Sequence, residues 1–80
     1  MITVRVQLYA TLRRYRPDLK VGEPLAVQLA EGSTVEHLLQ QLGVPQDEVK
    51  VVFVNGIVRD QNHPLADGDE LGIFPPIGGG

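Results

Sequence analysis

Alternating apolar and polar residues open the chain and predict a strand over residues 2–9. The apolar positions of this segment are Ile2, Val4, Val6 and Leu8. A period of two is typical of a strand with one buried face. The same period over residues 25–29 predicts a second strand. The segment between them allows one helical turn over residues 10–16, followed by a loop that contains Pro17, Gly22 and Pro24.

One segment has the period of a helix. Its apolar residues fall at positions i, i+3, i+4 and i+7, and they are Val35, Leu38, Leu39 and Leu42. Either Ser33 or Thr34 can serve as the N-cap. Gly43 suits the first position after the helix, and Pro45 prevents its continuation. The sequence therefore predicts a single main helix, which begins near residue 34 and ends before Gly43.

The second half of the chain predicts the remaining strands. Residues 51–54 are rich in β-branched side chains, and Asn55-Gly56 is a strong hairpin signal before a return strand that begins at Ile57. Residues 71–74 form the last strand. One helix on one face of a mixed sheet of about five strands is an α+β architecture. This order of elements predicts the β-grasp, or ubiquitin-like, fold for residues 1–76, with residues 77–80 as a flexible C-terminal glycine tail.

Size and composition exclude several functional classes. Eighty residues form one domain with a modest core and no volume for a deep substrate cleft. The absence of cysteine excludes a disulfide, an iron–sulfur cluster and a thiol nucleophile. The charged, alternating N-terminus is unlike a signal peptide, and no apolar run has the length of a membrane helix, so we expect a cytoplasmic protein with no membrane partner. From Glu31 onward acidic residues dominate over Lys50 and Arg59, which argues against a nucleic-acid partner and favours a basic protein partner.

The C-terminal tail is the strongest candidate for chemistry. Pro75-Pro76 cannot donate to a sheet, so it ends the last strand in an extended conformation. Six residues from Pro75 to Gly80 reach roughly 20 Å, enough to enter the active site of another protein. Glycine backbone passes where a Cβ would clash. The terminal carboxylate is ionised at neutral pH and unreactive until an ATP-dependent enzyme converts it into an acyl-adenylate, from which sulfur can displace AMP. The competing interpretation is a frayed end without function.

Other candidate residues have simpler interpretations. The acidic run over residues 67–70 lacks the ligand spacing of a calcium site and predicts a turn with solvated acids. His37 and His63 have no cysteine beside them, and no metal or catalytic role is assigned to either. The basic–aromatic cluster over residues 13–16 predicts a solvated loop or a contact at the rim of a partner interface, rather than an RNA or phosphate site.

Several segments resemble the MoaD group, the small subunits of molybdopterin synthase. They are Leu8-Tyr9-Ala10-Thr11-Leu12-Arg13, Phe53-Val54-Asn55-Gly56, Leu65-Ala66-Asp67-Gly68-Asp69-Glu70-Leu71 and Phe74-Pro75-Pro76-Ile77 with the glycines that follow. The resemblance covers essentially the whole chain and extends to the wider MoaD/ThiS group of ubiquitin-like sulfur carriers. Gly79 and Gly80 match the terminal pair of the family. Gly78 departs from it, because the family often has Ala or Ser there, and this change makes the tail more flexible.

The resemblance implies a carrier that is not an enzyme by itself. A MoeB-like activating enzyme would adenylate Gly80, a sulfur donor protein would supply the sulfur, and the C-terminus would become a 1-thioglycine, with no cofactor bound. Gly79 would allow the tail to fit. A MoaE-like large subunit would accept the tail and form the dithiolene of molybdopterin or tungstopterin. We expect the residues at the tail exit to bind partners: Phe74, Pro75, Pro76, Ile77 and Gly78.

Alternatives remain open from the sequence. The carrier could supply sulfur for thiazole, cysteine or tRNA thiolation, since the same tail chemistry serves those pathways. A ubiquitin-like modifier attached to lysines begins with the same adenylation step. A β-grasp binding module would need no covalent chemistry at all.

Overall fold

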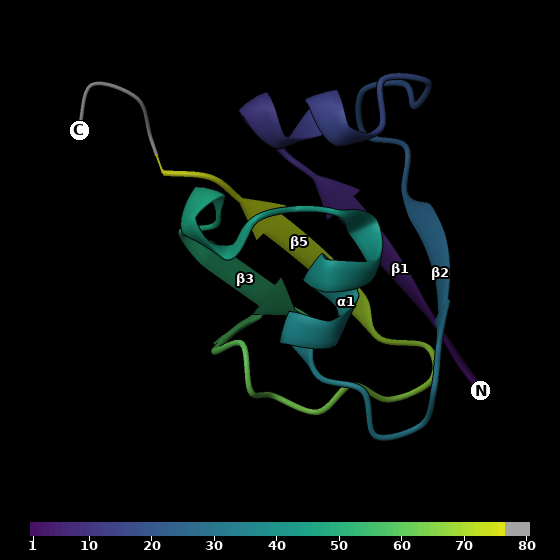
Figure 1. The fold of residues 1–80 in the computed structure, drawn as a ribbon. Helices are drawn as coiled ribbons and strands as arrows, with labels where there is room; N and C mark the ends of the chain where they lie inside the picture. Colours follow the sequence, from purple (N-terminus) through teal and green to yellow (C-terminus); the bar gives the residue numbers. More distant parts are fainter. Residues whose placement is uncertain (77–80) are drawn as a thin grey trace.

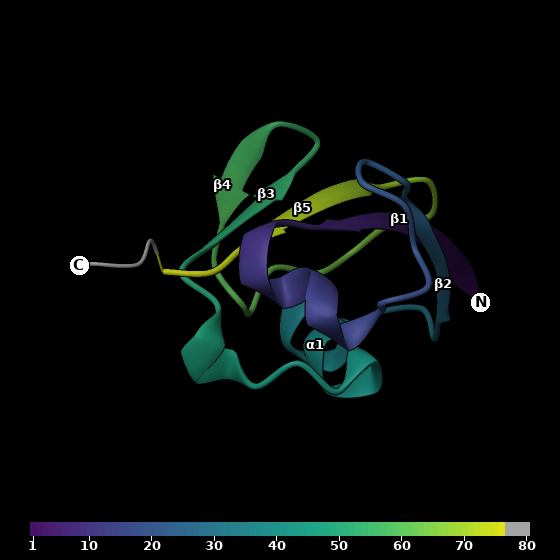
Figure 2. The ribbon, with the colours of Figure 1, turned by 90° about the horizontal axis from the view of Figure 1, so that it is seen from above.

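A five-stranded mixed sheet forms the framework of the computed structural model, which describes residues 1–76. The strands are β1 (Ile2–Leu8), β2 (Leu25–Leu29), β3 (Val51–Val54), β4 (Ile57–Arg59) and β5 (Glu70–Phe74). Their order across the sheet is β2-β1-β5-β3-β4 (Figures 1 and 2). The central pair β1 and β5 is parallel, and the other three pairs are antiparallel. The predicted mixed sheet and β-grasp architecture are confirmed.

The main helix, α1 (Val35–Leu42), has the predicted position and ends. Thr34 is its N-cap, and Gly43 follows it in the left-handed conformation at φ 77° that favours glycine. The predicted apolar stripe is buried, with Leu38 and Leu39 fully enclosed. Because only one face of the sheet is covered by α1, the strands have one core-facing side and one open side (Figure 2).

The core lies between α1 and the inner face of the sheet. In β1 the alternation of the sequence becomes alternation of burial, since Val4 and Val6 are fully enclosed while Thr3 and Arg5 are exposed. Burial of each such aliphatic side chain contributes about 1.5–3 kcal/mol to folding. Within residues 1–76 the core contains no buried polar or charged side chain.

Two short 3₁₀ helices close one end of the core. The first, η1 (Ala10–Tyr15), lies where one helical turn was expected and buries Leu12 completely. The second, η2 (Gln46–Glu48), was not predicted, because a segment of three residues carries no periodic signal. The Tyr15 hydroxyl donates to Glu48 Oε2 at 2.8 Å and joins the two helices. Both helices lie at the end of the molecule where β5 finishes (Figure 2).

None of the helices in the part of the chain that the structure describes is long and apolar enough to cross a membrane.

Candidate functional site: the root of the C-terminal tail and the open face of the sheet

The C-terminal segment leaves the fold from the end of its central strand. The N–H of Lys50 donates to the Phe74 carbonyl oxygen at 2.8 Å, and the N–H of Tyr9 donates to the Ile73 carbonyl oxygen at 3.1 Å. Strand β5 is thus held from both sides up to its last residue. Pro75 is half-buried and Pro76 is exposed, as expected of an exit from the domain. Because the root is fixed, the direction in which the tail begins is set by the sheet.

The rest of the tail lies outside the described residues. This applies to Ile77, Gly78, Gly79 and Gly80, so their roles, and the division of the chain at residue 76, stay predictions. Of the predicted partner-binding set, Phe74, Pro75 and Pro76 are described.

Three aromatic rings gather on the open face beside this exit. The rings of Tyr9 and Phe74 stack with their centroids 4.1 Å apart and their planes at 6°. Phe53 meets Phe74 edge-on, with centroids 5.6 Å apart and planes at 79°. All three side chains are half-buried, so each presents part of its surface to solvent. We call these three residues the aromatic cluster.

Strand register explains why the cluster lies on the open face. Val52 and Val54 are buried beneath α1, so Phe53 between them points to the other side of the sheet. The same alternation places Phe74 outside, next to buried Ile73. Val58 pairs directly with Phe53 and is 59% exposed, which extends the apolar surface onto β4. An apolar surface of this kind, rimmed by polar groups, is typical of a protein-binding site.

A shallow hollow continues from the aromatic cluster across the open face. One end is lined by the aromatic rings, and the other by Arg5, Asn55 and Glu70. Arg5 and Glu70 stand side by side on the neighbouring strands β1 and β5. The hollow therefore has an apolar half close to the end of β5 and a polar half farther away, which contains one positive and one negative side chain.

Sequence reasoning missed two residues of this site. The sequence predicts Tyr9 only as the last residue of the first strand, and Gly72 only as one residue of the last strand. Tyr9 has the same parity as Thr3, Arg5 and Gln7, which indicates the outer face, but that parity alone does not reveal Phe74 as its neighbour. The parallel pairing of β1 with β5 brings them together, and no local signal encodes it.

The acidic run over residues 67–70 forms the predicted turn, but its acids are not simply solvated. Asp67 Oδ1 accepts a hydrogen bond from the Thr3 N–H at 2.8 Å. Asp69 Oδ2 accepts one from the Ala66 N–H at 2.8 Å. The Asp67 carboxylate holds the turn against β1, and the Asp69 carboxylate closes the turn itself, so the first role of both is structural.

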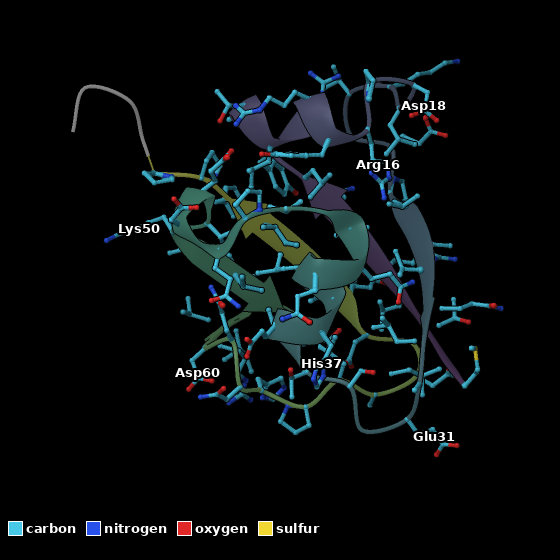
Figure 3. The ribbon with its side chains drawn as sticks, viewed as in Figure 1. Arg16, Asp18, Glu31, His37, Lys50 and Asp60 are labelled. Carbon is cyan, nitrogen blue, oxygen red and sulfur yellow. The ribbon has the colours of Figure 1, made fainter. Side chains whose placement is uncertain are left out.

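His37 has a structural role as well. Its Nδ1 accepts from the Thr34 N–H at 2.9 Å, and its own N–H donates to Thr34 Oγ1, so the two residues form a capping box. Figure 3 shows His37 near the start of α1, well away from Lys50 and the end of β5. Within residues 1–76 no three His, Asp or Glu side chains are grouped so that they could hold a metal ion.

The basic cluster over residues 13–16 belongs to η1 up to Tyr15 rather than to a loop, and Arg16 is the C-cap of that helix. Arg14 Nη2 donates to Glu48 Oε1 and, at 3.3 Å, to the Tyr15 hydroxyl. The hydrogen bond with Tyr15, followed by the charge of Glu48, raises the pKa of the Arg14 guanidinium above its ordinary value. Arg14 is therefore already engaged within the chain, which leaves less of this cluster free for an anion.

Comparison with known proteins agrees with this arrangement. The model of the ThiS family matches residues 6–80. The chain belongs to the ThiS family. Membership of the MoaD/ThiS group, predicted from the sequence motifs, is thereby confirmed, and the match extends through Gly79 and Gly80.

Three individual proteins show how far the similarity reaches. The molybdopterin synthase sulfur carrier subunit of Escherichia coli is 31% identical over 85 residues, which cover 96% of this chain and 99% of that protein. The putative molybdopterin converting factor subunit 1 of Pyrococcus furiosus has a TM-score of 0.75 and 25% identity, covering 96% of this chain and 100% of its own. A complex of subunits 1 and 2 of the molybdopterin-converting factor of Helicobacter pylori contains a chain with a TM-score of 0.63 and 20% identity, covering 99% and 100%. At that identity the last similarity shows the fold alone.

Proposed function

We propose that the chain is a sulfur carrier that delivers sulfur from a thiocarboxylate at Gly80, as the small subunit of a molybdopterin synthase. The observation that carries the proposal is the tail root: a central strand fixed up to Phe74, followed by Pro-Pro and glycines, next to an open aromatic face. The family match over residues 6–80 supports it, because it includes the terminal glycines. The E. coli relative, named as a sulfur carrier subunit of molybdopterin synthase, supports the choice of pathway.

The chemistry takes place at the terminal carboxylate. In an activating enzyme of the MoeB type, a carboxylate oxygen of Gly80 attacks the α-phosphate of ATP, and pyrophosphate leaves. A sulfide-equivalent nucleophile from a sulfur donor then attacks the carbonyl carbon and AMP leaves, so that the C-terminus becomes a 1-thioglycine. The chain supplies the tail and the docking surface, while its partners supply the catalytic groups. The dithiolene of molybdopterin, or of tungstopterin, is the proposed destination of the sulfur.

The open face is the proposed docking surface for a MoaE-like large subunit. A tail with a reach of about 20 Å brings Gly80 into the active site of a partner only when the surface at its root lies close to that partner. The aromatic cluster lies at that root and supplies the apolar, aromatic contacts that dominate binding energy in protein interfaces. The E. coli relative, named as a subunit of molybdopterin synthase, supports a partner subunit of this kind.

An intact-mass measurement tests the proposal. The protein is incubated with ATP, a MoeB-like activating enzyme and sulfide, and the expected product has one oxygen replaced by sulfur at Gly80. A variant that lacks Gly79-Gly80 is the matched control and should remain unchanged. The absence of both adenylate and thiocarboxylate on the intact chain would contradict the carrier and favour the binding module. Isopeptide-linked conjugates in cells would favour the ubiquitin-like modifier, and thiocarboxylate consumed without pterin would favour a different sulfur pathway.

A further inference from the structure

Tyr9 is held in place by hydrogen bonds as well as by stacking. Gln7 Nε2 donates to the Gly22 carbonyl oxygen at 2.9 Å, which leaves Gln7 Oε1 as the acceptor for the Tyr9 hydroxyl. One face of the Tyr9 ring lies on Phe74. The loop before β2 thus fixes Gln7, Gln7 fixes the hydroxyl of Tyr9, and Tyr9 fixes the ring that directly precedes the tail.

Gly72 provides the space in which these rings lie. A Cβ at this position would stand 3.2 Å from Tyr9 Cε2 and 3.3 Å from Phe74 Cε1. Those distances are shorter than ordinary carbon–carbon contact of about 3.5–4.0 Å, so one or both rings would have to move. Gly72 is an ordinary strand residue within β5. Only the rings therefore oppose a side chain there, unlike at the turn glycines Gly43 and Gly56, whose φ angles are positive.

We propose that Gly72 is a positioning residue for partner docking, which keeps the Tyr9–Phe74 stack flat on β5 so that Phe74 meets the partner in one orientation. This inference rests on the proposed function, because the occupant of the face is the large subunit that receives the tail. The physical reason is preorganisation: a side chain ordered before binding loses less conformational entropy when the interface forms. The stack borders the tail exit, so its orientation also sets where the tail enters the partner.

A double-mutant cycle separates this role from simple stability. Gly72→Ala, Tyr9→Ala and the double variant are compared with the original chain by calorimetric affinity for the subunit 2 protein of the molybdopterin-converting factor type from the same organism. Gly72→Ala should weaken binding about five- to tenfold, the amount that an aromatic pair supplies beyond its buried area. In the Tyr9→Ala background, Gly72→Ala should reduce the affinity much less, because the Tyr9 ring that it displaces is absent.

Ring-current shifts in proton NMR spectra report the stack directly. In the original chain the Tyr9 and Phe74 ring protons should be shifted upfield, and Gly72→Ala should reduce the shifts of both. Gln7→Ala is the second variant, which loosens Tyr9 without adding an atom and keeps the test valid should Gly72→Ala fail to fold. It should reduce the same shifts and weaken binding in the same direction. Ala26→Val is the matched control: it enlarges a small, exposed residue on the same face, opposite Arg5, and should change neither readout.

Three results would overturn the positioning role. The first is that Gly72→Ala leaves the ring-current shifts of Tyr9 and Phe74 unchanged. The second is that Gly72→Ala reduces these shifts but leaves the affinity for subunit 2 unchanged. The third is that the losses of binding free energy in Gly72→Ala and Tyr9→Ala add fully in the double variant. Failure of the proposed function is distinguishable from these, since in that case the original chain would neither gain sulfur nor bind subunit 2. If the original chain does both and Gly72→Ala matches it, only the inference about Gly72 fails.

Discussion

Asn55 joins the β3–β4 turn to the start of β5. Its φ of +52° lies in the left-handed region that Asn and Gly tolerate best. Its Nδ2 donates to Asp69 Oδ1 at 2.9 Å, and its Oδ1 accepts from the Glu70 N–H at 3.0 Å. The Asn55-Gly56 pair was predicted as a hairpin turn and is one, but the side chain also connects two turns that are separate in the sequence. This junction supports the polar half of the hollow.

Substitution of Asn55 should show the strength of the junction. Asn55→Gly keeps the positive φ and removes two side-chain hydrogen bonds, so the free energy of unfolding should fall by about 1–2 kcal/mol. Urea unfolding measures the difference. Asn62→Gly is the matched control, because there the bonded group is the backbone N–H, which donates to Asp60 Oδ1. Equal losses of unfolding free energy in the two variants would show that the loss comes from the conformational entropy of glycine in the unfolded chain. The hydrogen bonds of the Asn55 amide would then contribute nothing.

Helix α1 is stabilised by its first turn as well as by its buried stripe. The sequence left Ser33 and Thr34 as alternative caps, and the structure selects Thr34, with His37 as the reciprocal partner. Thr34 also forms a bridge with Pro64, so the cap ties the helix to the segment between β4 and β5. The position of α1 on the sheet thus depends on a long-range contact as well as on the helix sequence.

The N-cap assignment predicts that substitutions of Thr34 and of Ser33 differ in their effect on stability. Thr34→Ala removes the hydroxyl that accepts from His37 and should lower the free energy of unfolding by about 1 kcal/mol, the usual cost of a lost N-cap. Ser33→Ala should have little effect, since Ser33 takes part through its backbone N–H and carbonyl. Thermal unfolding of both variants measures the difference. A larger loss in Ser33→Ala would contradict this assignment.

At the scale of the whole molecule, the two faces of the sheet differ: the inner face packs in the core, and the outer face is the proposed partner-binding surface. The inner face is covered by α1 (Figure 2). The core lies on that side, while the outer face carries the aromatic cluster beside the end of β5. Substitutions of exposed residues on the outer face should therefore affect partner binding more than folding. Strand β4 allows a direct comparison, because Ile57 and Val58 are adjacent, similarly exposed at 54% and 59%, and on opposite faces.

Val58→Asp should weaken binding to the large subunit roughly tenfold or more, because a carboxylate would be desolvated beside Phe53 in the interface. Its melting temperature should change little, since Val58 is mostly exposed. Ile57→Asp adds the same charge on the same strand and is the control, with nearly unchanged affinity expected. Calorimetry and thermal unfolding are measured on both. Equal losses of affinity in the two variants would contradict the prediction. They would mean that the partner does not bind the open face, or that the added negative charge alone weakens binding.

Much of the fold was predictable because its signals are local. The alternation in β1 and β2, the apolar stripe of α1, its Gly43 terminus and the Asn55-Gly56 turn each depend on residues within a few positions of one another, where backbone propensity and burial act together. The Pro75-Pro76 exit and the terminal glycines were equally visible, since they need no partner segment to be recognised. The predicted partner-binding role of Phe74 stays a prediction, but the structure gives it a defined surface.

The sequence by itself therefore determined the five strands, the main helix with its Gly43 end, and the end of the last strand at Pro75-Pro76, because these follow from short-range periodicity and from the conformational limits of proline and glycine. Only the tertiary structure decided that Tyr9 lies on Phe74, that Gly72 leaves the space for both rings, and that Asp69 accepts from Asn55. The reason is that β1 pairs in parallel with β5, and that the β3–β4 turn meets the start of β5, although these segments lie far apart in the sequence. Such contacts depend on strand register, which is fixed by the burial of the whole inner face rather than by any local pattern.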